Sequence, residues 1–434
     1  MLNKSFSRLL CYRNIVSPRW IFTSCKLSVH DEIEVQKPVK KQEPKKYKLS
    51  INPEVRNYLV EKNFGKDILN LLPKKLIKKG FTQHSSLCLV DENAAERIVS
   101  LIYDDLRENT SFVVECSPGL GILTNKLLQY GIPKIHLFEK NENFYLSESP
   151  LMTLTQKYKE QIDLRKLDFF SVWVLLYRDL MYKEGSSEEY FRDAPTLEWK
   201  DKTANQIIAC IPNKYFLSAL LFNFIHQTRL FEYGRPAFYL AVPSFIWERI
   251  TADNNDVKKI RFYTQQNVVL HLAFDTTYFG ELPRKSFLPW PKEKPTKKKN
   301  PIDELNCPMV LVKLEVKKNV YDILDKEDWK GFWFFLKHCM RSKKSRVVME
   351  VEKLISGCGE RLVEKDYDIC TTFKELPPQK LLELFQTFKS WPEYDENLFI
   401  PSLIHNDDAK KNEDDKFEGE EEKENENSIQ WGSK

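Results

Sequence analysis

One short stretch of the sequence combines glycines with flanking apolar runs in the way that nucleotide-binding loops do. The apolar run Phe112–Val114 is followed by the loop Ser117–Gly121, and Ile122 and Leu123 then open a segment with apolar residues at helical spacing. Two glycines and a proline permit a tight turn, and ligands of open α/β sheets lie over such loops. Taken alone this is a weak signal, because a Pro-Gly turn between a strand and a helix is common in α/β proteins.

Two acidic residues strengthen the interpretation. Glu139 directly follows the apolar segment Lys134–Phe138, and a carboxylate about 20 residues after the loop can accept hydrogen bonds from both ribose hydroxyls of a nucleotide. The stretch Leu164–Phe170 then places Asp168 after a third short apolar segment, where it could meet an adenine amino group. The alternative is that all are solvated loop residues, which any α/β domain supplies. The spacing therefore predicts a nucleotide site at three successive strand ends.

The elements that would position this site follow in order along the chain. Strands are expected at Gln206–Pro212 and Phe238–Pro243, with a helix at Phe216–Phe231 between them, and Asn267–Phe274 with Met309–Val316 suits a closing antiparallel pair. From Tyr321 to Leu403 the pattern is wholly helical. We therefore expect an α/β domain over residues 49–318 and a helical domain over residues 319–404.

The two ends of the chain differ in composition from its middle. Residues 1–30 contain five bases and no acid, which is typical of a mitochondrial transit peptide, although an acid-free start can also arise by chance. Residues 31–48 predict a disordered linker, and the acidic residues 405–434 a disordered tail. The 434 residues contain no apolar run of a length that spans a membrane, so no membrane span is expected.

Metal chemistry is not expected. The nine cysteines occur singly, without a CxxC pair, and the seven histidines do not gather near them. We therefore predict no metal site, and we expect most cysteines to be buried small apolar residues.

Basic residues gather in two places. Five lysines between Lys292 and Lys299 form a Pro-rich loop, and four bases follow an aromatic stripe that includes Trp329 and Phe335: Arg341, Lys343, Lys344 and Arg346. Such a cluster can bind nucleic acid by releasing phosphate counterions, although a solvated surface has the same composition. The stripe itself is more typical of a protein core than of a stacking platform.

These residues together resemble the ribosomal RNA adenine dimethyltransferase family over most of residues 85–389. Ser86–Asp91 lies where the family has Gln-Asn-Phe-Leu-x-Asp, and Glu115–Gly119 is similar to its Glu-x-Gly-Pro-Gly loop. The resemblance implies a Rossmann-like class I methyltransferase domain followed by a small all-helical C-terminal domain. It also implies binding of S-adenosyl-L-methionine, with these positions as contacts: Leu89, Ser117, Gly119, Glu139 and Asp168.

The sequence departs from the family at the catalytic motif, Asn-Leu/Ile-Pro-Tyr/Phe. The aligned residues are Cys210, Ile211, Pro212 and Asn213, which lack both the amide that accepts the target amine's hydrogen bonds and the ring that stacks on a flipped adenine. Tyr215 could partly replace the ring. The resemblance therefore implies that methyl transfer by Cys210, Pro212 and Asn213 is lost or weak, while the donor site is only weakened.

A mitochondrial member with an eroded motif resembles the transcription-factor branch of this family. That resemblance implies a mitochondrial matrix protein of the nucleoid, which joins the single-subunit mitochondrial RNA polymerase, helps to melt promoter DNA and holds the separated strand. Two alternatives remain open: an active dimethyltransferase of mitochondrial small-subunit rRNA, and a purely structural ribosome-assembly protein. The polymerase-contact surface, the oligomeric state and the roles of the Lys-rich loop and acidic tail cannot be deduced from the sequence.

Overall fold

The computed structural model describes residues 51–62, 64, 68–77, 87–169, 172–182, 185, 187–211, 215–291, 305–342 and 344–396. All of these described residues belong to one compact unit, Leu49–Leu403. The predicted transit peptide, linker, Lys-rich loop 292–299 and acidic tail all lie outside the described residues.

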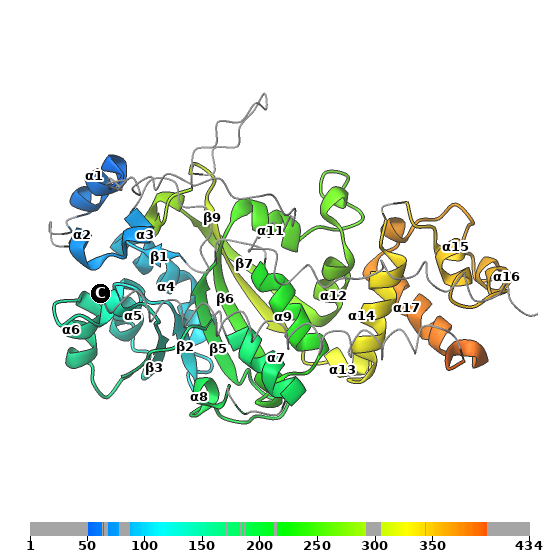
Figure 1. The fold of residues 1–434 in the computed structure, drawn as a ribbon, viewed down its shortest axis with the longest axis horizontal. Coiled ribbons are helices and arrows are strands. Elements are labelled where there is room, and N and C mark those ends of the chain that lie inside the picture. The colour runs from blue at the N-terminus through cyan, green and yellow to red at the C-terminus, as the bar shows by residue number, and fades with distance from the viewer. Residues whose placement is uncertain are drawn as a thin grey trace, which may run out of the picture. The chain divides into compact units, whose positions relative to one another are not determined.

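A seven-stranded sheet forms the centre of the unit Leu49–Leu403 (Figure 1), in the order β4-β3-β2-β5-β6-β9-β7. The first five of these strands run parallel, and β9 pairs antiparallel with both β6 and β7. The strand bounds are β2 Val113–Cys116, β3 Ile135–Phe138, β4 Ile162–Arg165, β5 Asn205–Cys210, β6 Pro236–Pro243, β7 Phe274–Leu282 and β9 Met309–Val316. A parallel core with one reversed strand confirms the expected α/β class.

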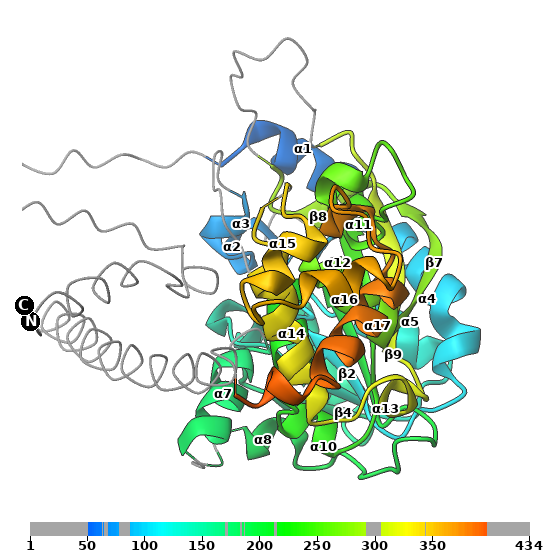
Figure 2. The same cartoon turned by 90° about the vertical axis from the view of Figure 1, so that its right-hand side faces the viewer.

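Helices cover both faces of the sheet (Figure 2), and its central strands β2, β5 and β6 are buried except at Cys210, the half-buried last residue of β5. One face packs against α4 (Glu92–Leu106), α5 (Ile122–Gln129) and α6 (Pro150–Lys157). The other face packs against a second group, which consists of α7 (Val172–Tyr182), α9 (Tyr215–Ile225), α10 (Arg229–Glu232), α11 (Ser244–Ile250) and α12 (Gln265–Ala273). Because both faces of the parallel strands are buried, their sequences are continuous apolar runs.

Short N-terminal elements add a further layer beside α4 and α5. These are α1 (Pro53–Glu61), α2 (Ile68–Leu71), α3 (Lys74–Ile77) and a small antiparallel ribbon of β1 (Cys88–Leu89) with β8 (Phe287–Leu288). The Asp91 carboxylate caps α4, since it accepts a hydrogen bond from the Asn93 N–H at 3.1 Å. Asp91 also accepts bonds from Ser286 and Tyr58 and pairs with Lys62. One carboxylate thus ties α1, α4 and the segment before β8 together.

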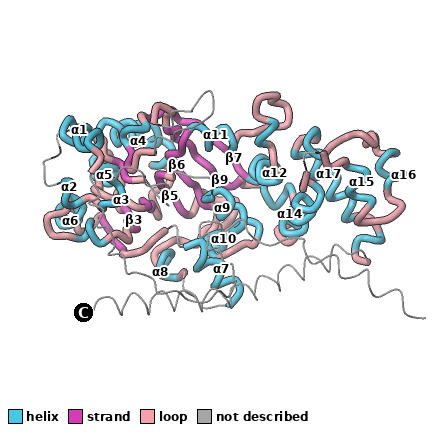
Figure 3. The backbone as a smooth tube through the Cα atoms, turned by 45° about the horizontal axis from the view of Figure 1, so that its top comes forward, coloured by secondary structure: helices cyan, strands magenta, loops and turns pink. Residues whose placement is uncertain are grey.

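The C-terminal part of the described chain is helical, as expected. It contains α13 (Val320–Ile323), α14 (Asp328–Cys339), α15 (Val347–Glu352), α16 (Gly359–Val363) and α17 (Pro378–Lys389), which the tube in Figure 3 shows as helices joined by loops. The aromatic stripe is core, because Trp329, Phe332 and Phe335 are fully buried. Their cluster continues into the helices on the sheet, where the Trp329 and Phe224 rings lie 5.1 Å apart. The predicted boundary between residues 318 and 319 is therefore crossed by one continuous apolar core.

Two expectations about elements were wrong. The segment Asn267–Phe274 is not a strand, because Gln265–Ala273 forms the buried helix α12, and β9 instead pairs with β7. Helix α12 is buried on nearly all sides, so most of its residues are apolar. Periodicity alone cannot show whether such a short apolar segment forms a helix or a strand. The expected helix Phe216–Phe231 is two helices, α9 and α10, with a break in which Gln227 adopts a φ of 51°. The third strand, β4, ends at Arg165, so Asp168 follows a strand end as expected.

Among the described residues, no helix is both long enough and apolar enough to cross a bilayer.

Candidate functional site

The glycine loop lies between β2 and α5 and has a left-handed backbone at three positions. Ser117, Gly119 and Gly121 have φ values of 56°, 59° and 74°. Left-handed geometry costs a residue with a side chain about 1–2 kcal/mol, so Ser117 is held there against its preference. At Gly119 a Cβ atom would lie 2.6 Å from the Cys88 Sγ, because β1 crosses over the loop. The cradle therefore exists only with glycine at position 119.

Glu139 fastens the loop to the end of β3, as the sequence position suggested. Its carboxylate accepts a hydrogen bond from the Gly119 N–H at 3.1 Å and another from the Asn141 N–H at 2.8 Å. The residue is 4% exposed. Burial raises the pKa of Glu139 above its usual value, although the backbone N–H donors oppose that shift. A buried carboxylate at a strand end, next to a glycine cradle, is suited to accept hydrogen bonds from ribose hydroxyls.

Asp168 lies after the end of β4, at the same edge of the sheet as Glu139. Its carboxylate is paired with the ammonium group of Lys140, and its backbone carbonyl accepts a hydrogen bond from the Tyr190 hydroxyl at 3.2 Å. The Asp168 side chain is 12% exposed, whereas that of Lys140 is 59% exposed. The lysine thus covers the carboxylate from the solvent side. Sequence reasoning missed Lys140, although its position directly after Glu139 was a usable signal.

A second buried acid lies behind the loop. Burial raises the pKa of Glu115 to about 7, and the nearby charge of Glu139 adds to the shift. The Thr124 hydroxyl donates to the Glu115 carboxylate at 2.6 Å. This bond joins β2 to α5 and fixes the direction in which the helix leaves the loop.

The catalytic position at the end of β5 is occupied by Cys210. Its backbone carbonyl accepts a hydrogen bond from the Leu87 N–H at 3.0 Å, so the end of β5 is tied to the segment before β1. Burial raises the pKa of the Cys210 thiol far above its ordinary value, and Glu115 and Cys88 contribute to that shift. A protonated thiol is a weak acceptor and cannot replace an amide oxygen. Pro212 and Asn213 lie outside the described residues.

Tyr215 is the first described aromatic residue after that motif. It opens α9 and is 41% exposed. An exposed ring soon after the end of β5 is in a position to contact a ligand, as its sequence position suggested. Its role stays a prediction.

Leu89 and its neighbour Cys88 lie differently relative to the glycine loop. Residues alternate sides along a strand, and Cys88 is the β1 residue whose side chain meets Gly119. Leu89 is buried and belongs to the apolar cluster that includes α4 and α5. The role proposed for Leu89 stays a prediction, while Cys88 was missed because a lone cysteine carries no signal of its own.

The basic residues lie in a different part of the fold. Arg341, Lys344 and Arg346 are exposed and occupy the turn between α14 and α15, while Lys343 lies outside the described residues. The structure thus brings Glu139, Asp168, Gly119 and Cys210 together at one edge of the sheet and leaves the basic residues on the helical part.

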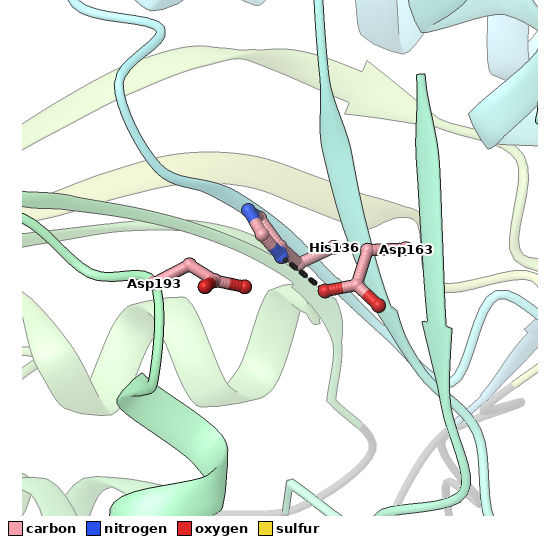
Figure 4. A group of neighbouring side chains, drawn as sticks. All are labelled: His136, Asp163 and Asp193. Carbon is pink, nitrogen blue, oxygen red and sulfur yellow. Dashed lines mark hydrogen bonds and ion pairs between the residues drawn. The ribbon is translucent and has the colours of Figure 1, made fainter. Parts of the chain in front are cut away.

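One cluster has the residue types of a metal site. Single ligand atoms of His136, Asp163 and Asp193 lie within 4.8 Å of one another (Figure 4). The buried Arg165 guanidinium, however, donates to both carboxylates, and His136 Nδ1 lies 3.0 Å from Asp163 Oδ2. A metal ion would have to displace this guanidinium, so the residues fit an ion-pair network that joins β3 and β4 to the segment after α8 (Glu188–Phe191).

The residues of the expected S-adenosyl-L-methionine site fit an adenosine ligand better than a metal or a phosphate. The loop has no room for a side chain at Gly119, and the two acids at the ends of β3 and β4 carry negative charge that would repel phosphate. Carboxylates at these positions suit hydroxyl and amino groups, which donate hydrogen bonds.

Comparison with known proteins agrees with this geometry. The family model described as ribosomal RNA adenine dimethylase matches residues 76–390. A Drosophila melanogaster protein named dimethyladenosine transferase 2, mitochondrial, is 26% identical over 390 residues, which cover 80% of this chain and 85% of that protein. The Homo sapiens protein of the same name is 21% identical over 320 residues, covering 69% and 77%. The chain is therefore similar to mitochondrial members of this family named dimethyladenosine transferase 2.

Solved structures of related proteins are more distant. A dimethyladenosine transferase from Plasmodium falciparum has a TM-score of 0.45 and 16% sequence identity, and the match covers 70% of this chain and 97% of that one. The family model spans more than half of the residues and includes Leu89, Ser117, Gly119, Glu139 and Asp168. The chain therefore belongs to the ribosomal RNA adenine dimethylase family.

Proposed function

We propose that this protein is a mitochondrial transcription initiation factor, built on a dimethyltransferase scaffold whose catalytic motif has eroded. It assists the mitochondrial RNA polymerase in melting promoter DNA and stabilises the open complex by holding the separated strand. Relatives named as mitochondrial support a mitochondrial location, and the matrix nucleoid is the compartment that this role requires.

The observation that carries the proposal is the thiol at the end of β5. The dimethyltransferase reaction needs an acceptor for the hydrogens of the adenine amino group, and Cys210 offers a half-buried thiol whose raised pKa keeps it protonated. Binding of a nucleic acid does not require this acceptor, because the groups that would contact its phosphates are different residues. Exposed bases such as Arg341 and Arg346 retain the capacity to release phosphate counterions.

S-adenosyl-L-methionine remains a proposed ligand with weak affinity. Glu139 would accept hydrogen bonds from its ribose hydroxyls and Asp168 from its adenine amino group, while the loop with Ser117 and Gly119 would allow its close approach. Leu89 would add apolar contact. When bound, the ligand would supply a methyl group, which nothing at Cys210 is suited to direct onto an amine.

Transcription from duplex and premelted promoters tests the initiation role. We expect the protein to stimulate the mitochondrial polymerase on duplex promoters and to have a smaller effect on premelted ones, because melting is then already complete. Reversing Arg341, Lys343, Lys344 and Arg346 to Glu should reduce the stimulation and flatten its dependence on salt. No stimulation on either template would refute the initiation role.

A second candidate is an active small-subunit rRNA dimethyltransferase. The glycine loop supports it, since the Gly119 N–H donates a hydrogen bond to the Glu139 carboxylate at 3.1 Å beside the place where a methyl donor would bind. Incubation with an rRNA hairpin that carries two adjacent adenines and with labelled methyl donor tests it directly. Efficient dimethylation by the unmodified protein would reverse the order of the two candidates.

A motif-restoring variant sharpens that assay. The substitutions Cys210→Asn and Asn213→Tyr recreate the family tetrapeptide, because Ile211 and Pro212 already match it. Methylation that appears only in this double variant would locate the lost activity in the motif. Asn213→Tyr alone is the matched control, since it restores the ring without the amide.

A further inference from the structure

The basic turn before α15 forms half of a short two-stranded ribbon. Arg346 and Thr372 are directly opposite each other in an isolated antiparallel bridge. Its backbone bonds run from the Val347 N–H to the Thr371 carbonyl at 3.0 Å and from the Phe373 N–H to the Ser345 carbonyl at 3.1 Å. Residues far apart in the sequence are thereby held in register.

The polar side chains beside this bridge face one hollow. Lys344, Arg346, Thr372 and Lys374 all line it. The opposite face is buried, since Ser345 is 6% exposed and Phe373 is 1% exposed. Cys370 lies two residues before Thr372, and it extends the polar face.

A loop from the sheet part of the molecule forms the facing wall. The short helix η3 (Ile260–Phe262) contributes Ile260 and Arg261, and the Lys374 ammonium donates to the Ile260 carbonyl at 3.3 Å. The Tyr263 hydroxyl donates to the Leu376 carbonyl at 3.1 Å and holds the two walls together. They enclose an open hollow of about 450 Å³, which is lined by Ile260, Arg261, Lys344, Arg346, Cys370, Thr372, Lys374 and Glu375.

The charges in this hollow are not balanced within the described chain. No described carboxylate lies within ion-pairing distance of Arg261, Lys344 or Arg346. Four exposed bases elsewhere on the helical part are paired: Lys353 with Glu350, Arg361 with Glu393, Lys380 with Glu383 and Lys389 with Asp328. The one acid of the lining, Glu375, accepts a hydrogen bond from the Thr372 N–H at 2.9 Å. The Arg261 guanidinium lies over the Phe262 ring, 4.5 Å from its centre, which restricts its position.

We propose that this hollow binds the backbone phosphates of a nucleic-acid strand, with Arg261 and Lys374 completing the site that Lys344 and Arg346 begin. Four cationic side chains from three segments of the chain, Arg261, Lys344, Arg346 and Lys374, line the hollow. The hollow therefore offers several cations to a strand rather than a single anion site. The proposal rests on the proposed function, because it specifies where the held strand runs.

Charge reversal in the facing wall provides the first test. Arg261→Glu changes an exposed residue outside the turn between α14 and α15, so the fold should be preserved, which a thermal melt verifies. We expect affinity for a single-stranded oligonucleotide to fall about 5- to 10-fold, and the slope of log K against log salt to decrease by about 0.7 for each phosphate that is no longer neutralised. Lys365→Glu, an exposed residue outside the hollow, is the matched control and should change neither quantity.

Cys370 provides a second test on the unmodified chain. It is the one exposed cysteine among the described residues and lies in the wall of the hollow. Bound single-stranded DNA or RNA should slow its alkylation by a maleimide, measured on the Cys370 peptide by mass spectrometry. Duplex DNA and inorganic phosphate at equal phosphate concentration are separate arms. Equal protection by inorganic phosphate would show a general anion site and overturn the proposal.

The outcomes separate the site from the function. If the full chain binds single strands and supports transcription while Arg261→Glu binds normally and Cys370 stays reactive, the strand runs elsewhere and only the proposed site is wrong. If the full chain binds no strand at all, the initiation role and the site fail together.

Discussion

At the scale of single residues, the two carboxylates of the proposed S-adenosyl-L-methionine site already have partners within the protein. The Glu139 carboxylate holds the loop N–H of Gly119, and the Asp168 carboxylate holds the ammonium of Lys140. An incoming adenosine must replace the second of these interactions with one from its amino group. In the proposed binding mode, Lys140 therefore competes for the same carboxylate that the adenine amino group would use.

Replacing Lys140 by Met should strengthen binding of S-adenosyl-L-methionine. The competing ion pair is removed, and a pair with one exposed partner is worth about 0–1 kcal/mol, so the gain should reach at most about fivefold. Titration calorimetry measures it. Lys166→Met is the matched control, since Lys166 forms a comparable exposed pair with Glu142 at 2.8 Å. Weaker binding in Lys140→Met would mean that the lysine contacts the ligand instead.

At the scale of elements, β1 acts as a clamp on the glycine loop. The Cys88 side chain lies where a side chain at position 119 would have to go. The ribbon partner β8 and the Asp91 bonds to Ser286 and Tyr58 hold β1 in that position. The loop conformation thus depends on contacts between segments that are distant in the sequence.

A double-mutant cycle can measure this clamp. Gly119→Ala should lower the free energy of unfolding by more than the cost of about 1–2 kcal/mol for its left-handed backbone, because the new methyl group also meets Cys88 Sγ. Adding Cys88→Ala should recover the steric part, with a coupling energy of about 0.5–3 kcal/mol in urea unfolding. Strictly additive losses would mean that the loop can move away from β1 freely.

At the scale of the whole described unit, the helical part and the sheet share one core. Trp329 of α14 packs against Phe224 of α9 and Phe332 of its own helix. The cluster extends from the strands to α17. A helical part that is joined in this way should unfold together with the sheet and carry the basic hollow in a fixed position relative to η3.

Trp329→Ala should therefore destabilise the entire unit. Loss of a fully buried indole costs about 3–5 kcal/mol, and unfolding followed by sheet-sensitive and helix-sensitive probes should stay in one transition. Trp329→Phe should cost much less, partly because the indole N–H has no hydrogen-bond partner among the described residues. Two separate transitions in the Ala variant would show instead that the helical part folds independently.

Much of the proposed S-adenosyl-L-methionine site could be predicted, because it depends on the order of strands, turns and helices along the chain. Each strand–turn–helix unit of a parallel sheet delivers the residues after its strand to the same edge, so Glu139 and Asp168 meet the glycine loop whatever the rest of the fold does. Helix α12 could not be predicted in the same way. Its apolar run, Val268–Ala273, is buried so completely that neither a helical nor an alternating period remains.

By itself, the sequence determined the family, the order of the strands that form the donor site and the loss of the amide and ring at Cys210 and Asn213. Only the tertiary structure decided that Lys140 covers Asp168, that Cys88 closes the loop and that Arg261 faces Arg346 across a hollow. The physical reason is that residue type and spacing determine which side chains stand at the end of each strand. Contacts between distant segments depend on how buried faces pack, and the linear order of residues does not record that packing.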